Sequence, residues 1–213
     1  MDRLAYRLHY ERQLPHYQPP GAVMFLTWRL AGSLPRHILN QLKAEAEQAR
    51  RELAQIEDPE ERQQQVYRKQ RQLFGRWDSF LDEAASGPTW LREPAVAEQV
   101  VESLHYRDGE VYDLDTFCVM PNHVHALFQP LECNEGEYHS LSSIMHSLKR
   151  YTAGTCNDVL GRKGQFWQRE SYDHVVRDEP ELDRIRRYIV NNPVRAGLVE
   201  DPADWPWTYA KYL

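Results

Sequence analysis

The sequence predicts an α+β fold in which a mostly antiparallel sheet carries helices on one face. Short runs of strand-forming residues alternate with helical repeats of apolar residues along the 213-residue chain. Some predicted strands are separated by only a tight turn, which suits antiparallel neighbours because parallel neighbours need a long crossover. Apolar residues make up 41% of the chain and charged residues 27%, as in ordinary globular proteins. We therefore expect one domain over residues 1–213.

Four segments are predicted to be strands, at residues 22–28, 111–120, 123–128 and 172–176. Each is rich in β-branched, aromatic or other apolar residues over a length typical of strands. Pro121 and Asn122 separate the second strand from the third, and they indicate a turn between them.

Three helices are predicted in the same part of the chain. Residues 94–104 begin with a proline, which the first turn of a helix tolerates. Ser140 is suited to cap the next helix, whose apolar residues recur with helical spacing. The last helix begins near Glu179, where acidic residues suit the helix dipole, and it is ended by Pro193 and Gly197.

Two further segments differ from this α+β pattern. Residues 36–85 are rich in Gln, Glu, Arg, Ala and Leu, with a single break at Asp58-Pro59. They predict an inserted helical hairpin whose charges form a solvated outer face. The C-terminal tail, about residues 200–213, is aromatic, and we expect it to pack back on the domain.

The charge balance bears on the class of partner. The net charge is −6, and this alone argues against a nucleic-acid partner, because phosphate binding needs Lys and Arg. Residues 144–197, however, hold ten basic and seven acidic residues, so a local basic surface is compatible with an acidic chain.

Compartment and cysteine use are less informative. No stretch approaches the roughly 20 apolar residues that span a bilayer, and the N-terminus lacks the apolar core of a signal peptide. We therefore expect a cytoplasmic protein without a membrane partner. The three cysteines are odd in number and form no C-x-x-C pair, so we predict buried free thiols.

His123 and His125 lie two residues apart in a predicted strand. Side chains alternate between the faces of a strand, so both imidazoles project to one face and Val124 and Ala126 to the other. Two imidazoles on one face can share a divalent cation. An H-x-H pattern alone is weak evidence in a chain with nine histidines, and two polar residues on an open sheet face is the competing interpretation.

Tyr188 and Asn192 lie one turn apart in the last predicted helix. They border the apolar stripe that contains Ile185 and Ile189, so we expect them to face the sheet obliquely. A tyrosine hydroxyl can attack phosphorus and form a covalent phosphotyrosine. A cation on the histidine pair would polarise the phosphoryl oxygen, and Asn192 could add an oxygen ligand. An ordinary core tyrosine is the competing interpretation, and Tyr172 is the second candidate nucleophile.

Three segments of the chain resemble one known family. Residues 117–125, FCVMPNHVH, resemble the histidine-hydrophobic-histidine (HUH) segment of the REP-associated tyrosine transposases, which are relatives of the IS200/IS605 single-strand transposases. Residues 164–177 and 188–199 resemble the same family, in matching order and spacing. The resemblance covers about residues 22–30 and 94–209, whereas 36–85 have no counterpart in the shorter members.

The resemblance implies a ferredoxin-like sheet and a metal-dependent enzyme. It implies Mg²⁺ or Mn²⁺ as cofactor, and cleavage and rejoining of single-stranded DNA near REP-like palindromic hairpins through a covalent 5′-phosphotyrosine. Tyr188 falls on the nucleophile position, His123 and His125 fall on the metal-ligand positions, and Asn192 falls where a third ligand occurs. His174 matches a recurrent histidine of the family. The sequence leaves the choice between monomer and homodimer open.

The same reasoning gives candidates for contacts with DNA. Arg184 and Arg187 point away from the apolar stripe, where phosphates could meet them. Trp167 offers a ring for stacking on bases, and core packing explains it equally well. The full set of DNA-binding candidates is Lys149, Arg150, Trp167, His174, Arg184, Arg187 and Arg195.

Two other functions stay open at this point. The first is a protein that binds DNA hairpins without catalysis. The second is a metallohydrolase that uses a metal-bound water, which would need a general base near the metal. Covalent attachment of DNA to the protein separates these alternatives.

Overall fold

The computed structural model describes residues 19–83 and 86–212, and the described elements belong to two units. The helical unit runs from Leu34 to Gly87, and the sheet unit consists of residues 19–33 and 88–212. Within the described ranges, no helix has the length and apolar character to cross a membrane.

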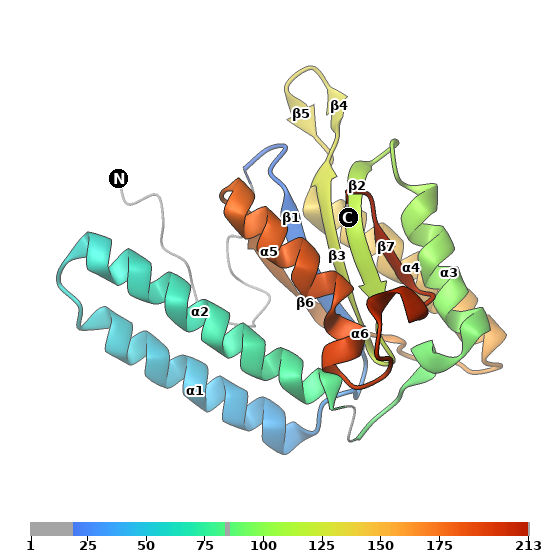
Figure 1. Cartoon of the computed structure of the whole chain (residues 1–213), viewed down its shortest axis with the longest axis horizontal. Helices are drawn as coiled ribbons and strands as arrows, with labels where there is room; N and C mark the ends of the chain where they lie inside the picture. Colours follow the sequence, from blue (N-terminus) through green and yellow to red (C-terminus); the bar gives the residue numbers. More distant parts are fainter. Residues whose placement is uncertain (1–18, 84–85, 213) are drawn as a thin grey trace. The chain divides into compact units, whose positions relative to one another are not determined.

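The sheet unit contains the predicted α+β arrangement (Figure 1). Its strands are β1 (Met24–Leu30), β2 (Tyr112–Val119), β3 (His123–Pro130), β4 (Glu132–Asn134), β5 (Glu137–Tyr138), β6 (Trp167–Val175) and β7 (Thr208–Ala210). Its α-helices are α3 (Pro94–Tyr106), α4 (Leu141–Val159), α5 (Glu179–Val190) and α6 (Asn192–Arg195), with short 3-10 helices η1 (Trp90–Arg92) and η2 (Pro202–Asp204).

Five strands form one antiparallel sheet in the order β6-β1-β3-β2-β7, and β4 and β5 pair separately. The centre of the sheet is therefore β3, with β1 and β2 on either side. A tight turn joins β2 to β3, in which the Met120 N–H donates to the His123 carbonyl at 2.9 Å. The predicted mixed class with an antiparallel sheet is confirmed.

The main core lies between the sheet and the helices α3 and α4. Trp28, Phe117 and Phe128 from three strands pack there with Leu104 of α3 and Leu148 of α4, and all five are buried. Ser140 caps α4 as the sequence predicts, since its hydroxyl accepts from the Ser143 N–H.

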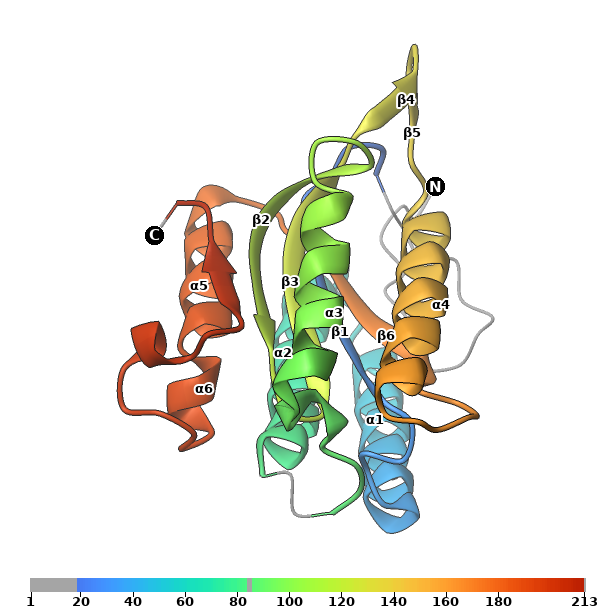
Figure 2. The same cartoon turned by 90° about the vertical axis from the view of Figure 1, so that its right-hand side faces the viewer.

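Helix α5 is the exception to the predicted placement of the helices on one face. Figure 2 shows α3 and α4 on one side of the sheet and α5 on the other. The apolar spacing of α5 correctly indicates a buried stripe at Ile185 and Ile189. Such spacing does not say which face of a sheet the stripe covers, so the sequence could not place this helix.

The helical unit is a hairpin of α1 (Arg36–Ala54) and α2 (Pro59–Asp82), as predicted. Asp58 caps α2 by accepting from the Glu61 N–H at 2.8 Å. Leu34, Trp77 and Leu81 form a small buried cluster. Two salt bridges of 3.0 Å, Glu52 to Lys69 and Glu45 to Arg76, tie the helices together along their length.

The strand predicted at residues 172–176 begins five residues earlier, at Trp167, and the C-terminal part of the chain also differs from the prediction. The last helix ends at Val190, and Asn192 begins the separate helix α6, because Pro193 has no N–H to donate to the preceding turn. The tail packs on the domain as expected, but residues 208–210 also add the edge strand β7 to β2. Trp205 donates from Nε1 to the Val119 carbonyl at 3.0 Å, which anchors the start of this tail.

Candidate active site

The two histidines of β3 project to the sheet face that α5 covers. Alternation along β3 places Val124 and Ala126 in the main core and His123 and His125 on the opposite face. In the register with β1, Thr27 lies opposite His125. Both histidines and Thr27 are fully buried.

The ring nitrogens of the pair converge. The Nε2 atoms of His123 and His125 lie 3.0 Å apart. Asn122 Oδ1 lies 2.7 Å from His123 Nδ1, and Thr27 Oγ1 lies 2.7 Å from His125 Nδ1. An amide oxygen only accepts, so His123 donates from Nδ1 to Asn122, and in the neutral ring Nε2 then presents its lone pair towards His125. Polar partners on the outer nitrogens are the usual arrangement around metal-binding imidazoles.

The spacing of the pair fits a divalent cation. Two neighbouring ligands of an octahedral ion, each at about 2.1 Å, are about 3.0 Å from one another. The Nε2 atoms have that separation. Neutral imidazole nitrogens are common ligands for divalent metal ions in proteins. The pair is therefore a candidate metal site.

Tyr188 is brought to this pair by α5. The helix is capped by Asp178, which accepts from the Glu181 N–H at 2.8 Å, and Pro180 lies in its first turn. The Tyr188 ring is half-buried and lies edge-on to His125, with ring centroids 5.6 Å apart. Phe25 also packs against both rings. Its ring centroid lies 6.1 Å from that of Tyr188 and 5.7 Å from that of His125.

Asn192 and Arg195 follow Tyr188 on the short helix α6. Asn192 is fully buried at the first position of α6, rather than one turn further along an unbroken helix as the sequence suggests. The guanidinium of Arg195 lies over the Tyr188 ring, 4.7 Å from its centroid. This cation–π contact makes Arg195 a direct neighbour of the candidate nucleophile.

A second polar cluster ties the start of α5 to β6. His174 lies opposite Phe25 in the sheet, and its Nε2 is 3.1 Å from Glu181 Oε1. Glu181 is buried and also accepts from the Arg177 N–H and from Arg184. The structure thus gives two of the predicted DNA-binding residues, His174 and Arg184, a common partner at the first turns of α5.

The other predicted DNA-binding residues are dispersed. Arg187 and Arg150 are exposed on the surface. Trp167 is buried in the main core, where its Nε1 donates to Thr152 Oγ1 at 2.8 Å. Lys149 donates to the carbonyls of residues 168–170 and to Ser171 Oγ, so it ties α4 to β6. Burial lowers the pKa of the Lys149 ammonium to about 8.

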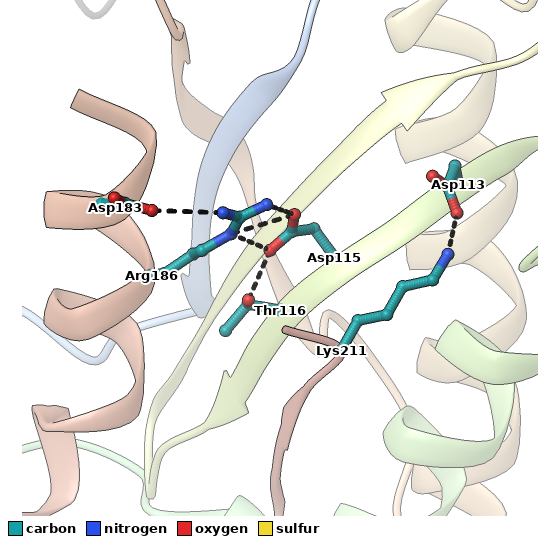
Figure 3. A network of polar contacts seen from close by, with 6 residues as sticks. All are labelled: Asp113, Asp115, Thr116, Asp183, Arg186 and Lys211. Atoms are coloured by element: carbon teal, nitrogen blue, oxygen red, sulfur yellow. Dashed lines mark hydrogen bonds and ion pairs between the residues drawn. The ribbon is translucent and has the colours of Figure 1, made fainter. Parts of the chain in front are cut away.

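A contact that the sequence did not indicate ties α5 to β2 (Figure 3). Arg186 donates through Nε and Nη2 to both carboxylate oxygens of Asp115, at distances from 2.6 to 3.2 Å, and through Nη1 to Asp183. Asp115 lies at the bulge of β2, between the paired residues Leu114 and Thr116. Its carboxylate also accepts from the Thr116 hydroxyl at 2.7 Å. A β-bulge redirects side chains, and no pattern in the sequence predicts the bulge at Asp115.

The chain is similar to known transposases over about half of its length. Residues 94–192, which include β3 and α5, match the family model described as "Transposase IS200 like". A Haemophilus influenzae protein provisionally named a REP-associated tyrosine transposase is 30% identical over 113 residues, covering 50% of this chain and 64% of that protein. An Escherichia coli K12 REP-associated tyrosine transposase is 26% identical over 97 residues, covering 46% of this chain and 53% of that protein.

A solved structure supports the fold. It is described as a REP-associated tyrosine transposase bound to a REP hairpin, and it matches with a TM-score of 0.53 at 16% identity, covering 93% of this chain and 82% of the other. Over residues 94–192 the chain is similar to IS200-like transposases, and the solved structure supports the fold alone. The two relatives described above are named REP-associated tyrosine transposases, and the match spans less than two thirds of the length of each.

Proposed function

We propose that this protein is a metal-dependent single-strand DNA transposase that cleaves and rejoins DNA near palindromic hairpins, with Tyr188 as its nucleophile. The observation that carries the proposal is the approach of the Tyr188 ring to His125, at 5.6 Å between centroids, beside the converging nitrogens of the histidine pair. The relatives named as transposases support the reaction class. The solved relative bound to a REP hairpin supports the type of DNA.

The covalent step follows from the chemistry of a phenol and a phosphodiester. The Tyr188 oxygen forms a bond to phosphorus as the bond from phosphorus to the 3′ oxygen of the preceding nucleotide breaks. The phenol loses its proton and the leaving 3′ oxygen gains one, so the products are a 5′-phosphotyrosine and a 3′ hydroxyl. In rejoining, a 3′ hydroxyl attacks the phosphotyrosine and the tyrosine leaves with a proton.

The residues around Tyr188 have distinct parts in this proposal. His123 and His125, with Asn192 as a further oxygen donor, would hold Mg²⁺ or Mn²⁺, which supplies polarisation of the phosphoryl oxygen. Asn122 and Thr27 orient the imidazoles. Arg195 covers the tyrosine ring and adds positive charge where a phosphate would approach.

The test is an incubation with labelled single-stranded hairpins from the DNA that flanks the gene of this protein, with Mn²⁺ or EDTA, followed by a denaturing gel. We expect a DNA–protein adduct that forms only with metal and is lost in His123→Ala. Cleavage without an adduct would instead indicate a metallohydrolase that uses water. Hairpin binding with neither cleavage nor adduct would indicate a binding protein without catalysis.

A further inference from the structure

The middle of α2 carries positive charge only. Residues 62–76 contain five basic residues and five glutamines, and they contain no Asp or Glu. The acidic residues of α2 lie near its ends, whereas α1 mixes both signs along its length. Opposite charges one turn apart stabilise a solvated helix. A helix segment with basic residues only lacks this stabilisation, so its charge pattern calls for another explanation.

Internal contacts account for three of the five cations. Lys69 pairs with Glu52 and Arg76 with Glu45, both on α1. Arg62 donates to the Ile56 carbonyl before the helix begins. Arg68 and Arg71 are exposed, and neither forms an ion pair within the described part of the chain. Arg71 lies over the Tyr67 ring, at 5.7 Å from the centroid, which supports its outward direction.

These two arginines belong to one stripe of the helix. At helical spacing, Gln64, Arg68, Arg71, Gln72 and Gly75 share the side opposite the buried cluster. The first four are exposed. We call these five residues the α2 stripe.

Gly75 is a second and independent feature of the α2 stripe. Glycine is among the least favourable residues in a helix interior, so its presence needs a reason. A Cβ added at Gly75 would meet no atom within 4 Å among the described residues. Packing within the described chain therefore does not require this glycine, whereas the close approach of an external backbone would.

We propose that the α2 stripe docks the phosphate backbone of duplex DNA, such as the stem of a hairpin. The choice of the hairpin stem rests on the function proposed above. Arginine forks bind phosphate oxygens in pairs, and glutamine amides donate to the same oxygens. Arg68 and Arg71 are separated by about 4.5 Å along the helix axis, so both reach one strand. A local cationic surface of this kind also explains how a chain with net charge −6 holds DNA.

The experiment measures binding of the full chain to a labelled duplex of unrelated sequence, as a function of salt concentration. Arg68→Gln/Arg71→Gln is compared with Arg50→Gln/Arg51→Gln, which removes the same charge from exposed positions on α1. Each phosphate contact contributes about 0.9 to the slope of log K against log salt. We expect the magnitude of this slope to be about 1.8 smaller in the α2 variant than in the wild type, and unchanged in the α1 variant.

Gly75→Ala gives a readout that a folding defect would not reproduce. We expect this variant to melt at a higher temperature, because alanine favours the helix, and yet to bind the duplex more weakly. Unchanged slopes in the α2 variant, or equal losses in both arginine variants, would overturn the proposal. The proposal would also be overturned if the protein bound an acidic polypeptide but did not bind duplex DNA.

This test is separable from the test of catalysis. If the wild type forms no adduct but the α2 variant still loses slope, the proposed function is wrong and the docking surface stands. If the wild type forms the adduct and the slope is unchanged in the α2 variant, the proposed function stands and the docking surface is wrong.

Discussion

The Nε2 atoms of His123 and His125 lie 3.0 Å apart, while the outer nitrogen of each ring contacts a polar side chain. Two lone pairs that face one another at this distance repel in a buried site, unless a cation or a proton lies between them. A bound cation would remove this repulsion, as would a proton on His125 Nε2, and the orientation of the two rings depends on Asn122 and Thr27.

Thr27→Val is expected to weaken Mn²⁺ binding by roughly 10–100-fold, because loss of a residue that orients a ligand has effects of that size. The hydroxyl that contacts His125 Nδ1 is lost, while the size of the side chain is kept. The measurement is Mn²⁺ titration by calorimetry or electron paramagnetic resonance. Thr208→Val is the control, since Thr208 contacts Cys118 Sγ and neither histidine. Equal affinities in the two variants would contradict this role of Thr27.

The Asp115–Arg186 contact is expected to stabilise α5 against the sheet. Both side chains are mostly buried, with 13% and 15% exposed, and the geometry is bidentate. A double-mutant cycle of Asp115→Asn and Arg186→Met should give a coupling free energy of about 1–2 kcal/mol. Hydrogen exchange of the α5 amides should speed up in each single variant.

The ion pair of Lys211 with Asp113 is a matched control for that cycle (Figure 3). It has the same 2.6 Å separation and involves the same strand, but its side chains are 35% and 46% exposed and it does not involve α5. We expect no measurable coupling from this pair, because exposed pairs are screened by water and salt. A coupling as large as that of Arg186 would mean that burial does not decide the difference.

Lys149 gives a prediction about stability and pH. Burial lowers the folded-state pKa of its ammonium from 10.5 to about 8. Between these values the unfolded chain binds more protons than the folded chain, so the contribution of Lys149 to stability rises with pH. Below about pH 8 both states are protonated and the contribution is constant. The measurement is the unfolding free energy of wild type minus that of Lys149→Met, followed from pH 7 to 10.5. This difference should increase with pH. A difference that stays constant would contradict the lowered pKa of Lys149.

Local patterns predicted most of the sheet unit. Apolar runs located β1, β2, β3 and the second half of β6, and alternation along 123–128 assigned both histidines to one face. Helical spacing placed Tyr188 at the edge of a buried stripe. These inferences need only neighbouring residues, which is why they could be made from the sequence.

The contacts that assemble the site depend on residues far apart in the chain. Thr27 meets His125 across β1 and β3, and Phe25 packs against both His125 and Tyr188. The bulge at Asp115 aims its carboxylate at α5. Sheet register and packing across layers decide these contacts, and neither can be read from local periodicity.

The proposed function requires that Tyr188 becomes covalently attached to DNA. The most direct test is to isolate the adduct formed with Mn²⁺ and a single-stranded hairpin from the DNA that flanks the gene. The adduct is then digested, and the modified residue is located by mass spectrometry. Tyr172→Phe is the matched control for Tyr188→Phe, since Tyr172 is also a tyrosine packed edge-on against Phe25, at 6.1 Å. We predict a nucleotide on Tyr188, an adduct in Tyr172→Phe, and no adduct in Tyr188→Phe. An adduct that survives in Tyr188→Phe would contradict the account.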